Sequence, residues 1–296
     1  MLTDFLKIPM DLLGAQGELA MSLLSRSFLH EVAPRADRRQ PVIALPGFLS
    51  SGTSFSRMIR FLKQQGFNAQ TWGMGRNQGL QGLSWPENLK RIESHMVKRI
   101  RNLADESGAP VSLIGHSLGG VYARELASRL ESEIDRIITL GSPTFHPYRV
   151  DRHNQVVNSF AYYLNRRRTS EFGGRQGLVH YDPDKPALPC VAIHSPVDGF
   201  VDEHACHIPG YIIAQSDRRA PRENVRVMSS HVGMTVNPAV MLAVADRLLA
   251  NRENWQVFDP ESYFPWYMKN AARVLFPDAR GIWEDRGTQQ FVEMNQ

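Results

Sequence analysis

Short apolar runs alternate with segments of helical periodicity along most of this chain, and this alternation limits the possible folds more than any other feature. Four apolar runs and two more polar segments are the strand candidates: 41–48, 68–74, 110–117, 134–143, 189–196 and 224–230. Helical patterns lie between these segments, at 53–65, 86–105 and 118–130, and after the last of them, at 237–250. Strands that are apolar throughout and alternate with helices predict an α/β fold, a mostly parallel sheet with helices on both faces. In such sheets ligands bind beyond the carboxyl ends of the strands.

The sheet-forming pattern covers residues 41–250, with one interruption and an extension at each end. Residues about 144–189 contain no clear strand before the next apolar run, and a loop of that length in a compact domain usually has a role. We therefore expect a cap insertion there, over the carboxyl edge of the sheet; the alternative is a surface excursion with no role. Residues 251–296 are rich in aromatic side chains and are expected to pack onto the domain as a C-terminal extension; the alternative is an interaction or membrane-contact surface.

Residues 1–40 form an apolar N-terminal extension that is expected to be helical. Asp4, Pro9, Asp11 and Glu18 interrupt its apolar residues, so it does not resemble a signal peptide. No apolar run of the chain is long enough to cross a bilayer. We expect an amphipathic helix that packs on the domain or touches a membrane surface, in a cytoplasmic protein.

Composition excludes several classes of function. The 296 residues are 42% hydrophobic and 22% charged, which allows a sizeable core. The net charge is +4 and no nucleic-acid motif accompanies it, so no nucleic-acid partner is expected. Cys190 and Cys206 are too few for a disulfide framework and fit a reducing compartment. His204, Cys206 and His207 lack a second cluster of ligands, so no metal site is expected.

The sequence Gly-His-Ser-Leu-Gly-Gly at 115–120 lies where a predicted buried strand meets a predicted helix. A Gly-x-Ser-x-Gly motif in this context holds the serine on a sharp, strained turn, with its hydroxyl exposed at the edge of the sheet. Side chains two positions before and after the serine would collide at the turn, so Gly115 and Gly119 are expected to form the nucleophile elbow. The helix that follows favours negative charge at its N-terminus. Ser117 is therefore the candidate nucleophile.

A serine hydroxyl needs a base within hydrogen-bond reach, and the base needs an orienting partner. On this type of scaffold the chain order is serine, then acid, then histidine. Asp198 comes just after the run 189–196, and His231 just after the candidate strand 224–230. Both are therefore expected at the carboxyl edge, as the acid and the base. Asp202 is an alternative acid.

The other histidines near these segments fit the role of base less well. His194 lies inside an apolar run and is expected to be a buried structural residue. His116 is expected to face away from the site, because successive residues at a strand end point in opposite directions. His204 and His207 follow the aspartate too closely and precede the last strand.

Acyl chemistry also needs hydrogen-bond donors for the oxyanion that develops on the carbonyl oxygen. The backbone N–H of Leu118, directly after the nucleophile, is one expected donor. The N–H of Phe48 is the other, in the loop after the first strand, where Gly47 lets the backbone approach closely. Loss of one such donor typically costs about a hundredfold to a thousandfold in turnover.

Taken together, the segments LPGF, GHSLGG, GSP, SPVDGFV and SSHVGM resemble the α/β-hydrolase superfamily, and within it the bacterial lipase and esterase branch. The resemblance spans about residues 41–250. Pro46-Gly47 stands where many lipase-like members have His-Gly. The resemblance implies ester hydrolysis through an acyl-enzyme, no cofactor, and often a mobile cap.

By that resemblance Ser117 attacks the ester carbonyl, His231 takes its proton and returns it to the leaving alcohol, and Asp198 orients the imidazole. Aromatic residues of the cap are candidates for an acyl pocket, or alternatively for the cap's own core. The pocket candidates are Phe145, Phe160 and Tyr163.

Three functions fit this pattern. The first is a serine hydrolase that cleaves small-molecule or lipid carboxylic esters, with lipid-like acyl groups favoured by the cap aromatics and the apolar N-terminus. The second is an acyltransferase that uses the same triad, with an acceptor chosen by the pocket. The third is a non-catalytic binding protein on a hydrolase fold. Such proteins usually lack a member of the triad, and all three members are present here.

Overall fold

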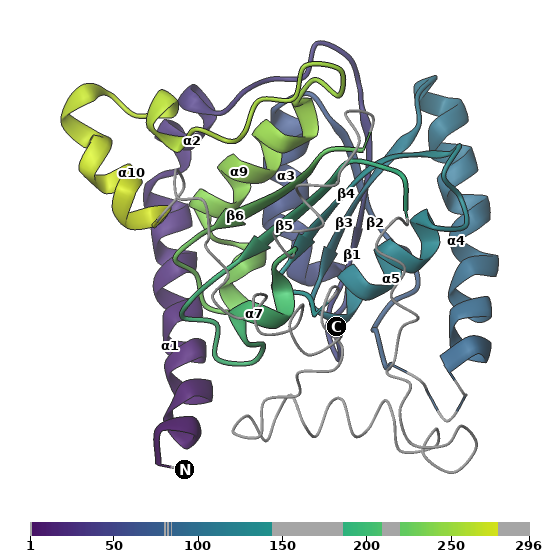
Figure 1. Ribbon diagram of the computed structural model, residues 1–296, viewed down its shortest axis with the longest axis horizontal. Coiled ribbons are helices and arrows are strands. Elements are labelled where there is room, and N and C mark those ends of the chain that lie inside the picture. Colours follow the sequence, from purple (N-terminus) through teal and green to yellow (C-terminus); the bar gives the residue numbers. More distant parts are fainter. Residues whose placement is uncertain are drawn as a thin grey trace, which may run out of the picture.

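A parallel β-sheet forms the centre of the computed structural model (Figure 1). The structure describes residues 2–79, 81, 83, 85–143, 186–208 and 220–277, without the side chains of residues 2–8 and 85. Within this part, six strands pair in the order β2-β1-β3-β4-β5-β6, and every pairing is parallel. The strands are β1 (Pro41–Leu45), β2 (Asn68–Thr71), β3 (Val111–His116), β4 (Ile134–Leu140), β5 (Cys190–His194) and β6 (Arg222–Arg226). The predicted mostly parallel α/β sheet is confirmed.

Helices cover both faces of this sheet (Figure 1). Val42 and Ala44 of β1 pack in one apolar cluster with α3 and α9, whereas Ile43 and Leu45 pack in the other with α4 and α5. This alternation follows from the two-residue period of a strand, and it explains why the strands are apolar throughout. The longer helices are α1 (Leu2–Leu24), α2 (Arg26–Val32), α3 (Ser56–Gln64), α4 (Trp85–Ser107), α5 (Leu118–Ala127), α9 (Pro238–Leu249) and α10 (Lys269–Leu275).

Short helical turns complete the described part of the chain. They are η1 (Gly52–Phe55), α7 (Glu203–Cys206), η2 (Val232–Thr235), η3 (Pro260–Tyr263) and η4 (Trp266–Met268). Two of them follow strands at the carboxyl edge: α7 comes after β5, and η2 comes after β6. The loops that enter α7 and η2 are those in which the sequence places the candidate acid and base.

The terminal extensions contribute differently to the core. Phe258, Phe264 and Phe276 of the C-terminal extension are buried in the same apolar cluster as α9, whereas Trp266 and Tyr267 are exposed. The N-terminal extension forms α1 and α2, and α1 runs along one flank of the molecule (Figure 1). None of the helices in the described ranges has the length and apolar character needed to span a membrane. The cap expected at about 144–189 lies almost wholly outside the described residues.

Candidate active site

Ser117 occupies a strained turn between β3 and α5. Its backbone has φ 53° and ψ −124°, a conformation that residues with a side chain adopt rarely. The Ser117 N–H donates a hydrogen bond to the Leu140 carbonyl at 2.9 Å, which holds the turn against the end of β4. A Cβ at Gly115 would overlap the backbone of Gly120, and one at Gly119 would overlap the Leu45 carbonyl. The two glycines flanking the serine are therefore sterically required.

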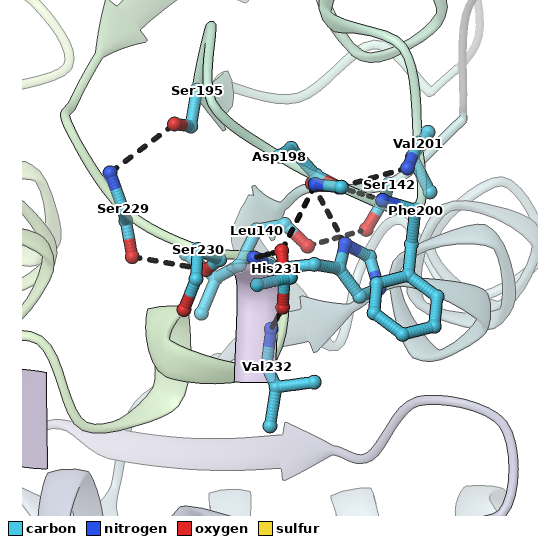
Figure 2. A network of polar contacts seen from close by, with 12 residues as sticks. Leu140, Ser142, Ser195, Asp198, Phe200, Val201, Ser229, Ser230, His231 and Val232 are labelled. Atoms are coloured by element: carbon cyan, nitrogen blue, oxygen red, sulfur yellow. Dashed lines mark hydrogen bonds and ion pairs between the residues drawn. The ribbon is translucent and has the colours of Figure 1, made fainter. Parts of the chain in front are cut away.

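Asp198 and His231 form a buried hydrogen-bonded pair (Figure 2). The His231 Nδ1 atom lies 2.7 Å from Asp198 Oδ2. The His231 side chain is 8% exposed and the Asp198 side chain 1%. The other carboxylate oxygen, Oδ1, accepts the backbone N–H groups of Phe200 and Val201 at 2.8 Å each. Because a carboxylate accepts hydrogen bonds, Nδ1 carries the proton. The Nε2 atom of neutral His231 is then a proton acceptor, as a general base requires.

The surroundings of His231 change its basicity. Burial by itself lowers the pKa of the imidazole, since a charged ring loses hydration. The negative charge and hydrogen bond of Asp198, together with the charge of Asp11, outweigh burial and leave the pKa above its ordinary value. The Phe200 ring packs 5.2 Å from the imidazole, centroid to centroid, and contributes to this burial. The arrangement favours a ring that can take up a proton during a reaction.

The expectation that His116 faces away from the site is wrong. Its ring lies 4.7 Å from the His231 ring, and its Nε2 donates a hydrogen bond to the His231 carbonyl at 2.9 Å. Burial, followed by the nearby charge of His231, lowers the pKa of His116 to about 3, so this ring stays neutral. The residue next to Ser117 is thus tied directly to the candidate base. The strand-end alternation rule does not apply here, because Ser117 lies after the end of β3 on a turn with φ 53°.

Gly141, at the end of β4, makes room for the acid–histidine pair. Its φ is 53°, and a Cβ there would lie 2.9 Å from Asp198 Oδ2 and 3.1 Å from His231 Nδ1. The sequence contains this residue in the segment GSP, but the crowding arises only when β4 pairs with β3 and β5. A side chain at this position would push the pair apart.

The loop after β1 lies against the nucleophile. A Cβ at Gly47 would be 3.1 Å from Ser117 Cβ, which confines this position to glycine or a slightly shifted backbone. Asn77 holds the loop in place, because its side chain donates to the Pro46 carbonyl at 2.8 Å and its own carbonyl accepts the Leu49 N–H at 2.7 Å. Asn77 is 1% exposed, and sequence reasoning missed it. The polar segment GRNQG, which contains it, was the only signal of its role.

Leu118 begins α5, where the first N–H groups of a helix have no acceptor within the helix. The predicted oxyanion donors, Phe48 and Leu118, therefore lie on segments that meet at Ser117. The pocket candidates Phe145, Phe160 and Tyr163 lie outside the described residues.

The remaining sequence candidates have other contacts. Asp202 caps the N-terminus of α7, where its Oδ1 accepts the His204 N–H at 2.8 Å. His194 is buried and lies 3.0 Å from Glu203 Oε1, which also accepts from Arg226 Nε at 2.6 Å. Both cysteines are buried and free. Among the described residues, no group of three or more histidine, cysteine, aspartate or glutamate side chains is arranged to hold a metal ion.

Two acidic residues of the N-terminal extension reach the site, and sequence reasoning assigned them no role there. Asp11 and Glu18 of α1 accept hydrogen bonds from the loop that carries His231. Their spacing of seven residues places them on one face of a helix, and acidic side chains in an otherwise apolar helix were the available signal.

The sheet order, the strained serine after β3 and the acid–histidine pair after β5 and β6 are the arrangement of an α/β-hydrolase fold. Residues 36–170 match the family model described as serine aminopeptidase, S33. The solved structure of an esterase from Pyrococcus furiosus aligns with a TM-score of 0.50 at 16% identity, over 72% of this chain and 82% of that one. At this identity the likeness shows the fold alone.

Two further matches are weaker: one covers less of this chain, and the other has a lower TM-score. A protein of Mus musculus described as a "serine hydrolase-like protein" is 27% identical over 173 residues, which are 57% of this chain. The match spans 50% of the length of this curated relative. A metagenomic carboxyl esterase aligns with a TM-score of 0.49 at 12% identity, over 73% of this chain and 76% of that one.

Proposed function

We propose that this protein is a serine hydrolase that cleaves carboxylic esters through an acyl-enzyme on Ser117. The observation that carries the proposal is the buried Asp198–His231 pair, whose Nδ1 contact leaves Nε2 available as a base at the same sheet edge as the strained serine. The description of the mouse relative as serine hydrolase-like supports the same class.

The proposal adds one contact to those described, a hydrogen bond from Ser117 Oγ to His231 Nε2. Such contacts are often long in free enzymes and shorten when substrate binds. The bond from His116 Nε2 to the His231 carbonyl supports this approach, because it fixes the base beside the residue that precedes the nucleophile. Rotation of the serine side chain then completes the triad.

In the first half-reaction Ser117 Oγ bonds to the ester carbonyl carbon while its proton passes to His231 Nε2. The negative charge on the carbonyl oxygen is stabilised by the N–H groups of Phe48 and Leu118 and by the N-terminus of α5. When the tetrahedral intermediate collapses, the bond to the alcohol oxygen breaks, and that oxygen takes the proton from His231. Asp198 stabilises the imidazolium throughout.

In the second half-reaction water attacks the acyl carbon and gives a proton to His231 Nε2. The bond to Ser117 Oγ then breaks, and the serine recovers the proton. The products are a carboxylic acid and an alcohol, and the enzyme returns to its starting state without any cofactor.

A lipid-like acyl group remains part of the proposal, on the basis of Phe145, Phe160 and Tyr163 in the sequence of the cap. p-Nitrophenyl esters of graded chain length test this part. A rise in kcat/KM from acetyl to octanoyl and longer chains is the expected result, and a preference for acetyl contradicts it.

A substrate panel run beside Ser117→Ala tests the central proposal. The panel contains esters, thioesters, lactones and an aminoacyl anilide, and a fluorophosphonate probe with mass spectrometry reports the labelled residue. Ser128→Ala is the matched control, because this serine lies at the C-terminal end of α5, the helix that begins directly after Ser117. We expect labelling at Ser117 and ester hydrolysis that falls at least about a thousandfold in Ser117→Ala only.

The other outcomes are equally informative. Absence of labelling in the folded wild type, or ester hydrolysis that survives Ser117→Ala, would overturn the proposal. Faster cleavage of the anilide than of any ester would replace ester hydrolysis by amide hydrolysis. Acyl transfer to added alcohols in preference to water would identify a transferase with the same nucleophile.

A further inference from the structure

The N-terminal helix α1 reaches into the candidate active site through Asp11. This side chain is 2% exposed. Its Oδ2 accepts the N–H of His231 at 2.6 Å and the N–H of Gly199 at 2.9 Å, and its Oδ1 accepts the N–H of Val232 at 3.1 Å. One carboxylate therefore bonds both to the loop that carries the acid and to the loop that carries the base.

We propose that Asp11 is a positioning residue for the acid–histidine pair, so that the N-terminal helix is part of the catalytic apparatus rather than a packing or membrane element alone. This inference rests on the proposed function. Asp11 does not touch the reacting atoms in the mechanism above. It acts through the backbone of His231 and of Gly199, the neighbour of Asp198.

The contacts are strong ones. Hydrogen bonds from backbone N–H groups to a carboxylate are charge-assisted and about twice as strong as bonds between neutral groups. Without Asp11, the N–H groups of His231, Gly199 and Val232 would lose this acceptor, and leaving a buried donor without an acceptor is destabilising. Because the loops after β5 and β6 belong to different strands, a shared acceptor also fixes the distance between them.

A second pair of contacts aligns the helix. Glu18, two turns after Asp11, accepts the Ser230 N–H at 2.6 Å through Oε1 and the Ser229 hydroxyl at 2.8 Å through Oε2. Between them lies Gly14, where an added Cβ would be 3.2 Å from Ser230 Cβ. In the segment that faces α1, a Cβ at Gly233 would overlap the Glu18 carboxylate.

Positions 11, 14 and 18 thus form one face of α1 that matches residues 229–233 in shape and in hydrogen bonding. Helical periodicity places these three positions together. A helix that only covered the apolar core would need neither the two acids nor the glycine between them.

Asp11 also contributes charge at the site. Its carboxylate acts on the His231 imidazole in the same direction as Asp198 does, raising the pKa of the ring against the effect of burial. Removal of that charge is therefore expected to lower the pKa of His231. A residue with a merely structural role would not move this value, which gives the inference a specific test.

Asp11→Asn is the main variant, because it keeps the size of the side chain while removing the charge and one acceptor. We expect kcat to fall about tenfold to a hundredfold with little change in KM, as is typical of a small misplacement of reacting groups. The acid limb of the kcat/KM profile should move to lower pH. The imidazole pKa of His231, followed by NMR with ¹⁵N-labelled histidine, should move in the same direction.

Glu18→Gln is the matched comparison, because it lies on the same helix face and bonds to the same loop. It should lower the melting temperature and leave the His231 pKa at its wild-type value. Leu13→Ala, on the exposed side of α1, should change neither quantity. Asp11→Glu keeps the charge and lengthens the side chain, so we expect a lower kcat with the pH profile in its wild-type position.

The inference is overturned if Asp11→Asn keeps the wild-type kcat and the wild-type pKa of His231. Where Asp11→Asn does not fold, a wild-type kcat in Asp11→Glu contradicts the positioning role. The NMR titration requires no turnover. A wild type that hydrolyses no ester would therefore refute the proposed function, while the effect of Asp11 on His231 could still be measured.

Discussion

Asp198→Asn should abolish most of the activity while the fold is preserved. The side-chain oxygen of an asparagine can still accept the N–H groups of Phe200 and Val201, each 2.8 Å from Oδ1 in the wild type. Its NH₂ group then faces His231 Nδ1, 2.7 Å away, and can only donate. The imidazole must accept at Nδ1 and carry its proton on Nε2, so it cannot take the proton of Ser117.

The expected loss in kcat is about 10⁴-fold, the size known for the same change in a serine protease triad. Initial rates with a p-nitrophenyl ester measure it, and thermal unfolding checks the fold. We expect a change in the free energy of unfolding of about 1–3 kcal/mol, for one weakened buried hydrogen bond.

Asp202→Asn is the matched control, since this residue lies four positions further on and only caps α7. Its kcat should stay within about twofold of the wild type, because the helix cap is exposed and asparagine caps as well as aspartate. The reasoning is refuted if Asp198→Asn keeps a tenth or more of the wild-type kcat, or if Asp202→Asn shows the larger loss.

Three further predictions concern the residues around the pair. Gly141→Ala should destabilise the protein by about 1–2 kcal/mol because of its φ of 53°, and should lower kcat by displacing the pair; denaturant titration and ester hydrolysis measure the two effects. The kcat/KM of the wild type should rise with pH through a pKa above the ordinary 6.5 of histidine, because His231 must be neutral to act and its pKa is raised; an acid limb below 6.5 would contradict this. The raised pKa also makes folding stability depend on pH. Charged His231 stabilises the folded protein fully below pH 6.5, and this stabilisation is lost as the pH rises through the raised pKa. Asn77→Ala should lower kcat more than it raises KM, because the loop with the Phe48 N–H loses its support, and unchanged kinetics would separate that loop from catalysis.

Features with a local physical cause were predictable from the sequence. A strand buried on both faces is apolar throughout, so β1, β3, β4 and β5 were visible as runs of apolar residues. The glycines around Ser117 serve a turn that lies entirely within one short segment. Parallel strands end at the same edge of a sheet, and for this reason the sequence order alone was enough to place Asp198 and His231 near each other.

The sequence by itself thus determined the α/β class, the order of the elements and the position of the serine on its turn. Only the tertiary structure decided that Asp198 rather than Asp202 bonds to His231, since both follow β5 and differ only in how the chain turns there. It also decided the roles of Asp11, Asn77 and Gly141. Each of these residues acts on a part of the chain that is distant in sequence, through contacts that exist only after the sheet has formed and α1 has packed against it.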